Sequence, residues 1–118
     1  LKKSVQIGPT NALFAQGPGG LSADILRSIA LELRSKKRNS VIALTSLVDG
    51  KVVLVVAVDD EARTAGVKAG ALVKTGSTVL GGGGGGKDDF AQGGGVDASK
   101  IDSAFAEMKK ALQGTLGA

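Results

Sequence analysis

An uninterrupted apolar run, Val-Val-Leu-Val-Val-Ala-Val at residues 52–58, most limits the folds open to this chain of 118 residues. A strand with one face in water alternates apolar and polar residues, whereas this run does not, so both of its faces must be covered. Asp49-Gly50 separates it from a second β-branched run, Val41 to Val48, and Asp-Gly in that position is a strong hairpin signal. The sequence therefore predicts antiparallel strands over 41–48 and 51–58, the second inside a sheet with helices on both faces.

A short strand and a helix are predicted before the hairpin. Asn11 to Gln16 suits a strand, and Gly17-Pro18-Gly19-Gly20 ends it because these residues fit no regular element. Ser22 can cap the helix that follows, and Asn39 can end it. The apolar residues of this helix repeat at every fourth position, which predicts a buried stripe. The stripe consists of Leu21, Ile25, Ile29 and Leu33.

A third segment, residues 59–74, is predicted to be helical after the hairpin. Asp59 or Asp60 can cap it, and its Ala, Leu and Val residues supply apolar contacts. Glycine inside a helix costs about 1 kcal/mol relative to alanine. We therefore expect a break near Gly66 and close packing at Gly70.

The last predicted helix begins near Ala98, with Asp97 or Ser99 as its cap. Its apolar residues fall at spacings of four, three and four, which places them on one helical face. That face, expected to be buried, consists of Ile101, Phe105, Met108 and Leu112.

Together these elements predict an α/β fold made of one domain over residues 1–118. Its mixed β-sheet contains the antiparallel hairpin, helices pack on the faces of the sheet, and a glycine-rich loop precedes the last helix. Residues 1–10 are expected to be the remnant of a preceding linker or helix, and residues 114–118 a tail. The start at Leu1, without Met, suggests a fragment of a longer protein.

Composition excludes several kinds of chemistry. The chain has no Cys and no His, which rules out disulfides, thiolate chemistry, imidazole catalysis and most zinc sites. No apolar run approaches the roughly 20 residues of a membrane helix, so we expect no membrane partner and a cytoplasmic location. Fifteen Lys and Arg residues against eleven Asp and Glu give a net charge of +4, which favours nucleic acid or another polyanion.

Four cations cluster at the end of the first predicted helix: Arg34, Lys36, Lys37 and Arg38. Cations at a helix C-terminus complement the helix dipole, and this explanation is sufficient by itself. Four cations within five residues exceed what capping requires, so a second, weaker phosphate-contacting patch is the alternative.

The segment from Leu80 to Gly95 holds nine glycines and is the most informative part of the sequence. Glycine backbone can approach a phosphate closely and point successive N–H groups at it. A Walker phosphate loop is disfavoured because Asp88 replaces the hydroxyl residue that would hold magnesium. A dinucleotide fingerprint matches any run of six glycines, and a flexible linker would not enclose Lys-Asp-Asp-Phe-Ala-Gln.

The run Lys87-Asp88-Asp89-Phe90-Ala91-Gln92-Gly93-Gly94 after the glycines resembles the signature of the C-terminal (C-Ala, DHHA1-type) domain of alanyl-tRNA synthetases. Gly66-Val67-Lys68-Ala69-Gly70 is similar to a second motif of that family, and the resemblance extends from about Asn11 to Leu112. Two positions depart from the pattern: Asp88 stands where Pro is common, and glycine occupies a loop position often held by Lys.

The resemblance implies a non-catalytic tRNA-binding module that holds the outer corner (elbow) of tRNA and couples aminoacylation with editing. It implies alanine tRNA and other domains of the same ligase chain as partners, with no catalytic residue, metal ligand or cofactor in this domain. ATP, magnesium and zinc would serve other domains of the full-length enzyme. The implied RNA-binding residues are Gly84, Gly85, Gly86, Lys87, Gln92, Gly93, Gly94 and Gly95, with Arg34, Lys36, Lys37 and Arg38 as the weaker patch.

Several alternatives stay open. Phe90 can pack beneath the glycine loop or stack on a base. The module can instead serve dimerisation and assembly, including a homodimer, or bind nucleic acid generally. The domain type also resembles the C-terminal lobe of a phosphoesterase superfamily, where a Gly-Gly-Gly-His loop holds nucleotide or single-stranded nucleic acid for a separate metal-bearing domain. Lys87 replaces that histidine here, so the resemblance implies binding without hydrolysis.

Overall fold

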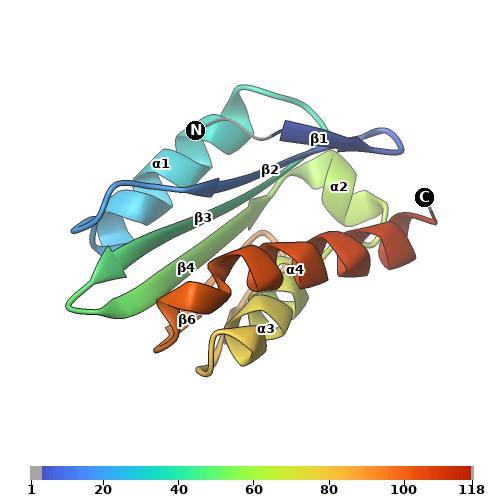
Figure 1. Cartoon of the computed structure of the whole chain (residues 1–118). Coiled ribbons are helices and arrows are strands. Elements are labelled where there is room, and N and C mark those ends of the chain that lie inside the picture. Colours follow the sequence, from blue (N-terminus) through green and yellow to red (C-terminus); the bar gives the residue numbers. More distant parts are fainter. Residues whose placement is uncertain (1–3, 118) are drawn as a thin grey trace.

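A computed structural model describes residues 4–117 as one sheet with helices on both faces (Figure 1). The strands are β1 (Ser4–Ile7), β2 (Thr10–Gln16), β3 (Ser40–Val48), β4 (Lys51–Val58), β5 (Gly84–Gly86) and β6 (Phe90–Gly95). The helices are α1 (Ala23–Ser35), α2 (Asp60–Thr64), α3 (Ala69–Val79), the short 3-10 turn η1 (Ala98–Lys100) and α4 (Ile101–Leu116). No helix formed by residues 4–117 is long and apolar enough to cross a membrane.

The six strands form one mixed sheet in the order β1-β2-β3-β4-β6-β5. Only β2 and β3 run parallel, joined by the crossover helix α1, and the other neighbours are antiparallel. The predicted hairpin is confirmed: Val48 pairs with Lys51, and Asp49 and Gly50 both adopt positive φ, as a tight two-residue turn requires. The predicted interior position of β4 is also confirmed, since β3 and β6 flank it.

Two apolar cores lie on opposite faces of the sheet, which confirms the predicted α/β class. On one face, Leu26 and Ala30 of α1 pack on strand residues. On the other face, α3 and α4 cover the sheet (Figure 1). Met108 and Leu112 of α4 are fully buried there. Alternate residues of β4 serve the two cores: Val55 and Ala57 face α1, whereas Leu54, Val56 and Val58 face α3 and α4.

The buried stripe predicted for α1 is wrong for Ile25 and Ile29, whereas Leu21 and Leu33 pack partly buried against the core. Ile25 and Ile29 are 49% and 38% exposed, whereas Leu26 and Ala30 are 1% and 0% exposed. Both Ile25 with Ile29 and Leu26 with Ala30 have the four-residue spacing of one helical face. The face with Leu26 and Ala30 is the buried one, because the small side chain of Ala30 lets the helix backbone approach the sheet. The predicted cap is correct, since the Ser22 hydroxyl accepts a hydrogen bond from the Ile25 N–H at 3.4 Å.

The predicted helix over 59–74 is divided into α2 and α3 at Gly66, whose φ of +104° no other residue adopts easily. Asp59 caps α2, accepting the Ala62 N–H at 3.0 Å. Helix α3 runs to Val79, beyond the predicted end at residue 74. Close packing at Gly70 is confirmed, since a Cβ there would lie 3.0 Å from the Gly86 carbonyl oxygen.

The last helix confirms most of its prediction. Asp97 caps η1 through the Ser99 N–H at 3.1 Å, and α4 follows directly. Ile101, Met108 and Leu112 are buried as expected, and Ala104 joins them. Phe105 is only partly buried, with its ring centroid 5.6 Å from that of Phe14 in β2.

Both ends of the described chain differ from expectation. Residues 4–10 are not a remnant of a linker or helix, because Ser4–Ile7 forms β1 and pairs with β2. Residues 1–3 lie outside the described part. At the other end, α4 continues to Leu116 and Gly117 caps it in a left-handed conformation, so residues 114–117 belong to the helix and its cap rather than to a tail.

Candidate nucleic-acid interface

The glycine-rich segment is a β-hairpin at the edge of the sheet, not the loop that the sequence predicted. Strands β5 and β6 pair antiparallel, and β5 forms the edge. The Lys87 N–H donates to the Phe90 carbonyl oxygen at 3.0 Å and closes the turn. Glycine has low strand propensity, so local sequence argues against these strands. Tertiary packing favours them.

Close approach of helix and strand explains the glycines of this hairpin. A Cβ on Gly93 would lie 2.5 Å from the Ser77 hydroxyl oxygen and 2.8 Å from a methyl carbon of Val73, both in α3. A Cβ on Gly95 would overlap the Leu80 carbonyl oxygen just beyond α3. Helix α3 therefore lies directly on glycine backbone, and packing alone explains why these positions are glycine.

The hairpin turn also completes the start of α3. Lys68, at the N-cap position, makes no side-chain capping hydrogen bond. The turn supplies the acceptors instead: the Ala69 N–H donates to the Asp88 carbonyl oxygen at 2.9 Å, and the Gly70 N–H donates to the Lys87 carbonyl oxygen at 3.1 Å. These N–H groups are therefore occupied by protein, although a helix N-terminus can otherwise bind an anion.

Register decides which glycine N–H groups face solvent. The Gly94 N–H donates to the Gly83 carbonyl oxygen, and the Lys87 N–H donates to the Phe90 carbonyl oxygen. In an antiparallel ladder every second pair is hydrogen-bonded, so Gly85–Gln92, midway between them, is also a hydrogen-bonded pair. Gly84 and Gly86 lie at the intervening positions, so their N–H groups point to the open edge of the sheet.

The backbone N–H groups of Gly93, Gly94 and Gly95 lie inside the sheet, and an RNA-binding role for these three residues stays a prediction. These three residues belong to the interior strand β6 and pair with β4, while Gly93 also lies opposite Gly84 of β5. The ladder uses their N–H groups. The three residues shape the sheet that carries the site.

A groove of about 420 Å³ lies between α1 and the hairpin, on the same face of the sheet as α1. Its charged side chains are Arg27, Arg34, Lys87 and Asp89, so cations exceed carboxylates by three to one. The remaining lining residues are Leu31, Gly85, Gly86, Phe90, Ala91 and Gln92. The groove thus brings together four of the eight glycine-hairpin residues predicted from the sequence and one of the four predicted helix-end cations.

Arg27 is a groove residue that the sequence analysis missed. Its guanidinium carbon lies 5.0 Å from the centroid of the Phe90 ring, within the range of a cation–π contact. The spacing of Arg27, Leu31 and Arg34 by four and three residues places all three on one side of α1, and this spacing was the available signal. Phe90 itself packs partly into the α1 core, as the first of its two predicted placements required.

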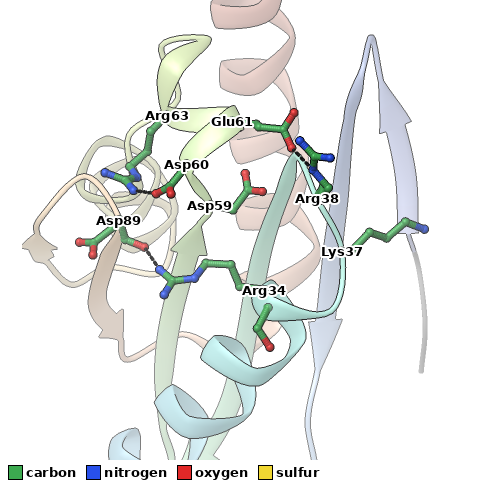
Figure 2. A pocket seen from close by; sticks show the side chains of 9 residues that line it. Arg34, Lys37, Arg38, Asp59, Asp60, Glu61, Arg63 and Asp89 are labelled. Carbon is green, nitrogen blue, oxygen red and sulfur yellow. Dashed lines mark hydrogen bonds and ion pairs between the residues drawn. The ribbon is translucent and has the colours of Figure 1, made fainter.

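The basic end of α1 borders a second cavity, of about 520 Å³, that also holds carboxylates (Figure 2). Arg38 pairs with Glu61 at 2.9 Å, and Arg63 of α2 pairs with Asp60. Asp59 accepts the N–H groups of Asn39 and Ser40 at 2.6 and 3.1 Å. Acids therefore balance the cations around this cavity.

The four cations of the predicted second patch do not line one common cavity. The Arg34 side chain donates to the Asp89 carbonyl oxygen at 3.1 Å, as the dashed line in Figure 2 marks. Lys36 pairs with Glu32 at 3.5 Å and does not line the cavity, and the Lys37 side chain points away from the carboxylates (Figure 2). Among them, only Arg34 reaches the groove beside the hairpin.

Comparison with known proteins places these features in a family. The model of the DHHA1 domain matches residues 10–114. The chain belongs to the DHHA1 domain family. The DHHA1 match covers the glycine hairpin, the groove and every element from β2 through most of α4.

Relatives of this DHHA1 domain are much longer proteins. The chain is 47% identical over 114 residues to the alanine–tRNA ligase of Kocuria rhizophila, which covers 95% of the chain and 13% of the ligase. It is 53% identical over 90 residues to the ligase of Kineococcus radiotolerans, covering 74% of the chain and 10% of the ligase. The chain thus spans about an eighth or less of the relatives that it matches.

Solved structures share the fold of this DHHA1 domain. The C-Ala domain of Aquifex aeolicus alanyl-tRNA synthetase superposes with a TM-score of 0.80 at 29% identity, over 98% of this chain and 99% of that one. RecJ from Thermus thermophilus superposes with a TM-score of 0.64 over 86% of this chain and 14% of its own, at 17% identity. The second match shows the fold alone. Together they confirm the single mixed-sheet domain.

Proposed function

We propose that this chain is a non-catalytic, tRNA-binding module of an alanine–tRNA ligase. The observation that carries the proposal is the groove between α1 and the glycine hairpin, with three cations against one carboxylate. Such a groove attracts the phosphate backbone of RNA and releases its counterions. Similarity to alanine–tRNA ligases over 95% of the chain supports tRNA as the particular RNA. On this proposal, ATP, magnesium and zinc serve other domains of the ligase.

Within the ligase, the module holds the outer corner, or elbow, of the tRNA. The acceptor end is then left to the catalytic domains, and one bound tRNA can serve aminoacylation and editing in turn. Tethering to those domains raises the effective concentration, so weak intrinsic binding suffices. The partners are alanine tRNA and the other domains of the same chain, and the place of work is the cytoplasm.

The proposal is tested by measuring how this chain binds alanine tRNA and an unrelated tRNA at two salt concentrations. Lys87→Ala removes an exposed cation at the groove. Lys109→Ala removes one from the exposed side of α4 and is the matched control. We expect salt-sensitive binding to both tRNAs and a salt dependence reduced by about one counterion in Lys87→Ala. The control variant should bind like the parent chain.

Two results would count against this function. Absence of binding to either tRNA at low salt would remove the role for the isolated domain. Equal losses in Lys87→Ala and Lys109→Ala would show that net charge, rather than the groove, governs binding.

We infer an assembly role as the second candidate, because Ile25 and Ile29 expose two large apolar side chains on neighbouring turns of α1. Exposed apolar residues that adjoin one another are typical of contact surfaces. Sedimentation of the chain over a range of concentrations tests this role, with Ile25→Ser as the variant. A mass that rises with concentration in the parent but not in the variant would support a homodimer, and a constant monomer mass would oppose it.

A further inference from the structure

Arg27 and Phe90 form a pair that differs from the other cations of the groove. The chain contains three aromatic residues, and two of them, Phe14 and Phe105, contact one another on the far face of the sheet. Phe90 alone lines the groove, anchored at the start of β6 with part of its ring in the α1 core. The guanidinium of Arg27 lies over this ring at 5.0 Å.

Neighbouring contacts leave Arg27 available to a ligand. Arg34 already donates from Nη1 to the carbonyl oxygens of Asp89 and Val58, so this group serves the fold. Arg27 takes part in none of the ion pairs formed within residues 4–117, and it is exposed to solvent. Its guanidinium lies over the Phe90 ring and lines the groove.

We propose that the Arg27–Phe90 pair is a stacking platform for an exposed nucleobase of the bound RNA. This inference rests on the proposed RNA-binding function. A guanidinium is planar and stacks on bases, whereas an ammonium of equal charge does not. Phe90 holds the guanidinium from below, and the base covers it from above.

Residues on the same strand face extend the platform. Gln92 lies two residues after Phe90 in β6, so both side chains project from the same face of the sheet, and both line the groove. Its exposed amide can donate to and accept from the edge of a base held on Arg27. The outward N–H groups of Gly84 and Gly86 lie along the adjacent sheet edge, where the phosphates of the same strand would pass.

The test compares two probes of equal length and charge: a short oligoadenylate, and an abasic oligomer with the same backbone. Arg27→Lys keeps the charge at position 27 and removes the planar group, while Lys87→Ala removes a charge and leaves the platform. Alanine tRNA is titrated in parallel with each protein. Circular dichroism of each variant confirms that the fold is retained.

We expect the parent chain to prefer the oligoadenylate over the abasic oligomer by about tenfold, the scale of one stacked base. Arg27→Lys should lose most of this preference while binding the abasic oligomer as the parent does. Lys87→Ala should bind both probes more weakly and keep the preference.

Equal binding of both probes by the parent chain, or an unchanged preference in Arg27→Lys, would overturn the platform. If tRNA still bound under those conditions, the tRNA-binding function would stand without it. Loss of tRNA binding in the parent chain would instead defeat the proposed function itself.

Discussion

Gly94 in β6 and the backbone carbonyl of Val52 in β4 lie so close that no side chain fits between them. A Cβ at position 94 would overlap that oxygen, and the strand backbone on both sides would have to shift. The same hairpin contains glycines of another kind, since a Cβ on Gly85 would meet nothing within 4 Å. Glycines of identical appearance in the sequence thus have opposite tolerance.

Gly94→Ala should therefore destabilise the domain by about 2–4 kcal/mol, because an overlap with backbone cannot be relieved by rotating a side chain. Gly85→Ala, the matched control, should change the free energy of unfolding by less than about 1 kcal/mol. Urea unfolding followed by circular dichroism measures both. Similar costs for the two variants would contradict the described packing of the hairpin.

Leu26→Ala should cost about 2–5 kcal/mol, because Leu26 is enclosed between α1 and the sheet. Ile25→Ala, one residue earlier, should lie within about 0.5 kcal/mol of the parent, since Ile25 is half exposed and alanine is a good helix former. The midpoints of urea unfolding distinguish them. A larger loss of stability in Ile25→Ala than in Leu26→Ala would instead support burial of the predicted stripe that contains Ile25.

Arg34→Ala should cost about 1–2 kcal/mol, because it leaves the carbonyl oxygens of Asp89 and Val58 without their charged donor. Arg38→Ala is the control, since its pair with Glu61 is exposed and such pairs contribute about 0–1 kcal/mol. Thermal unfolding of both variants at two salt concentrations tests this. If salt reduced the stabilisation by Arg34 more than that by Arg38, the Arg34 hydrogen bonds would not be partly buried as described.

The stability of the domain should depend on the ionisation of Asp97. The hydrogen bond from the Ser99 side chain, together with the Ser99 N–H and nearby Lys100, holds the pKa of this carboxyl below its usual value of 3.8. As the pH falls, Asp97 therefore binds a proton in the unfolded chain at a higher pH than in the folded chain. The stabilising contribution is complete above the usual pKa and is lost as the pH falls through the lowered pKa of the folded state.

Asp97→Asn keeps an oxygen for the cap but cannot titrate in this range. Between about pH 5 and about pH 2, the parent should lose more stability than this variant does. Urea unfolding at steps of pH measures the difference. Parallel curves for the two proteins would show that Asp97 contributes nothing to the acid sensitivity.

The parts of the fold that the sequence predicted correctly have local causes. Asp49-Gly50 sets the turn between β3 and β4, Gly66 interrupts the helix by its own backbone conformation, and Ser22 caps α1 three residues from its partner. Each of these features depends on residues close together in the chain, so the pattern alone was sufficient.

The parts that were wrong depend on contacts between distant residues. The hairpin over 84–95 exists because α3 lies on glycine backbone, which propensity cannot show. Strand β1 requires β2 as its partner, and Ala30 determines which face of α1 is buried. In the candidate site, Lys87 and Gln92 were predicted from a motif, while Arg27 emerged only when α1 was placed beside β6.

The carbonyl groups of the hairpin turn accept hydrogen bonds from the start of α3, so the turn and the first residues of this helix should open together in local unfolding. The amide protons of Ala69 and Gly70 are protected from exchange with solvent only while the turn is docked. Their exchange rates thus report opening of the turn directly, without a probe on the hairpin itself. A ligand that clamps the hairpin should slow exchange at these two amides, although they lie on a helix that it never touches.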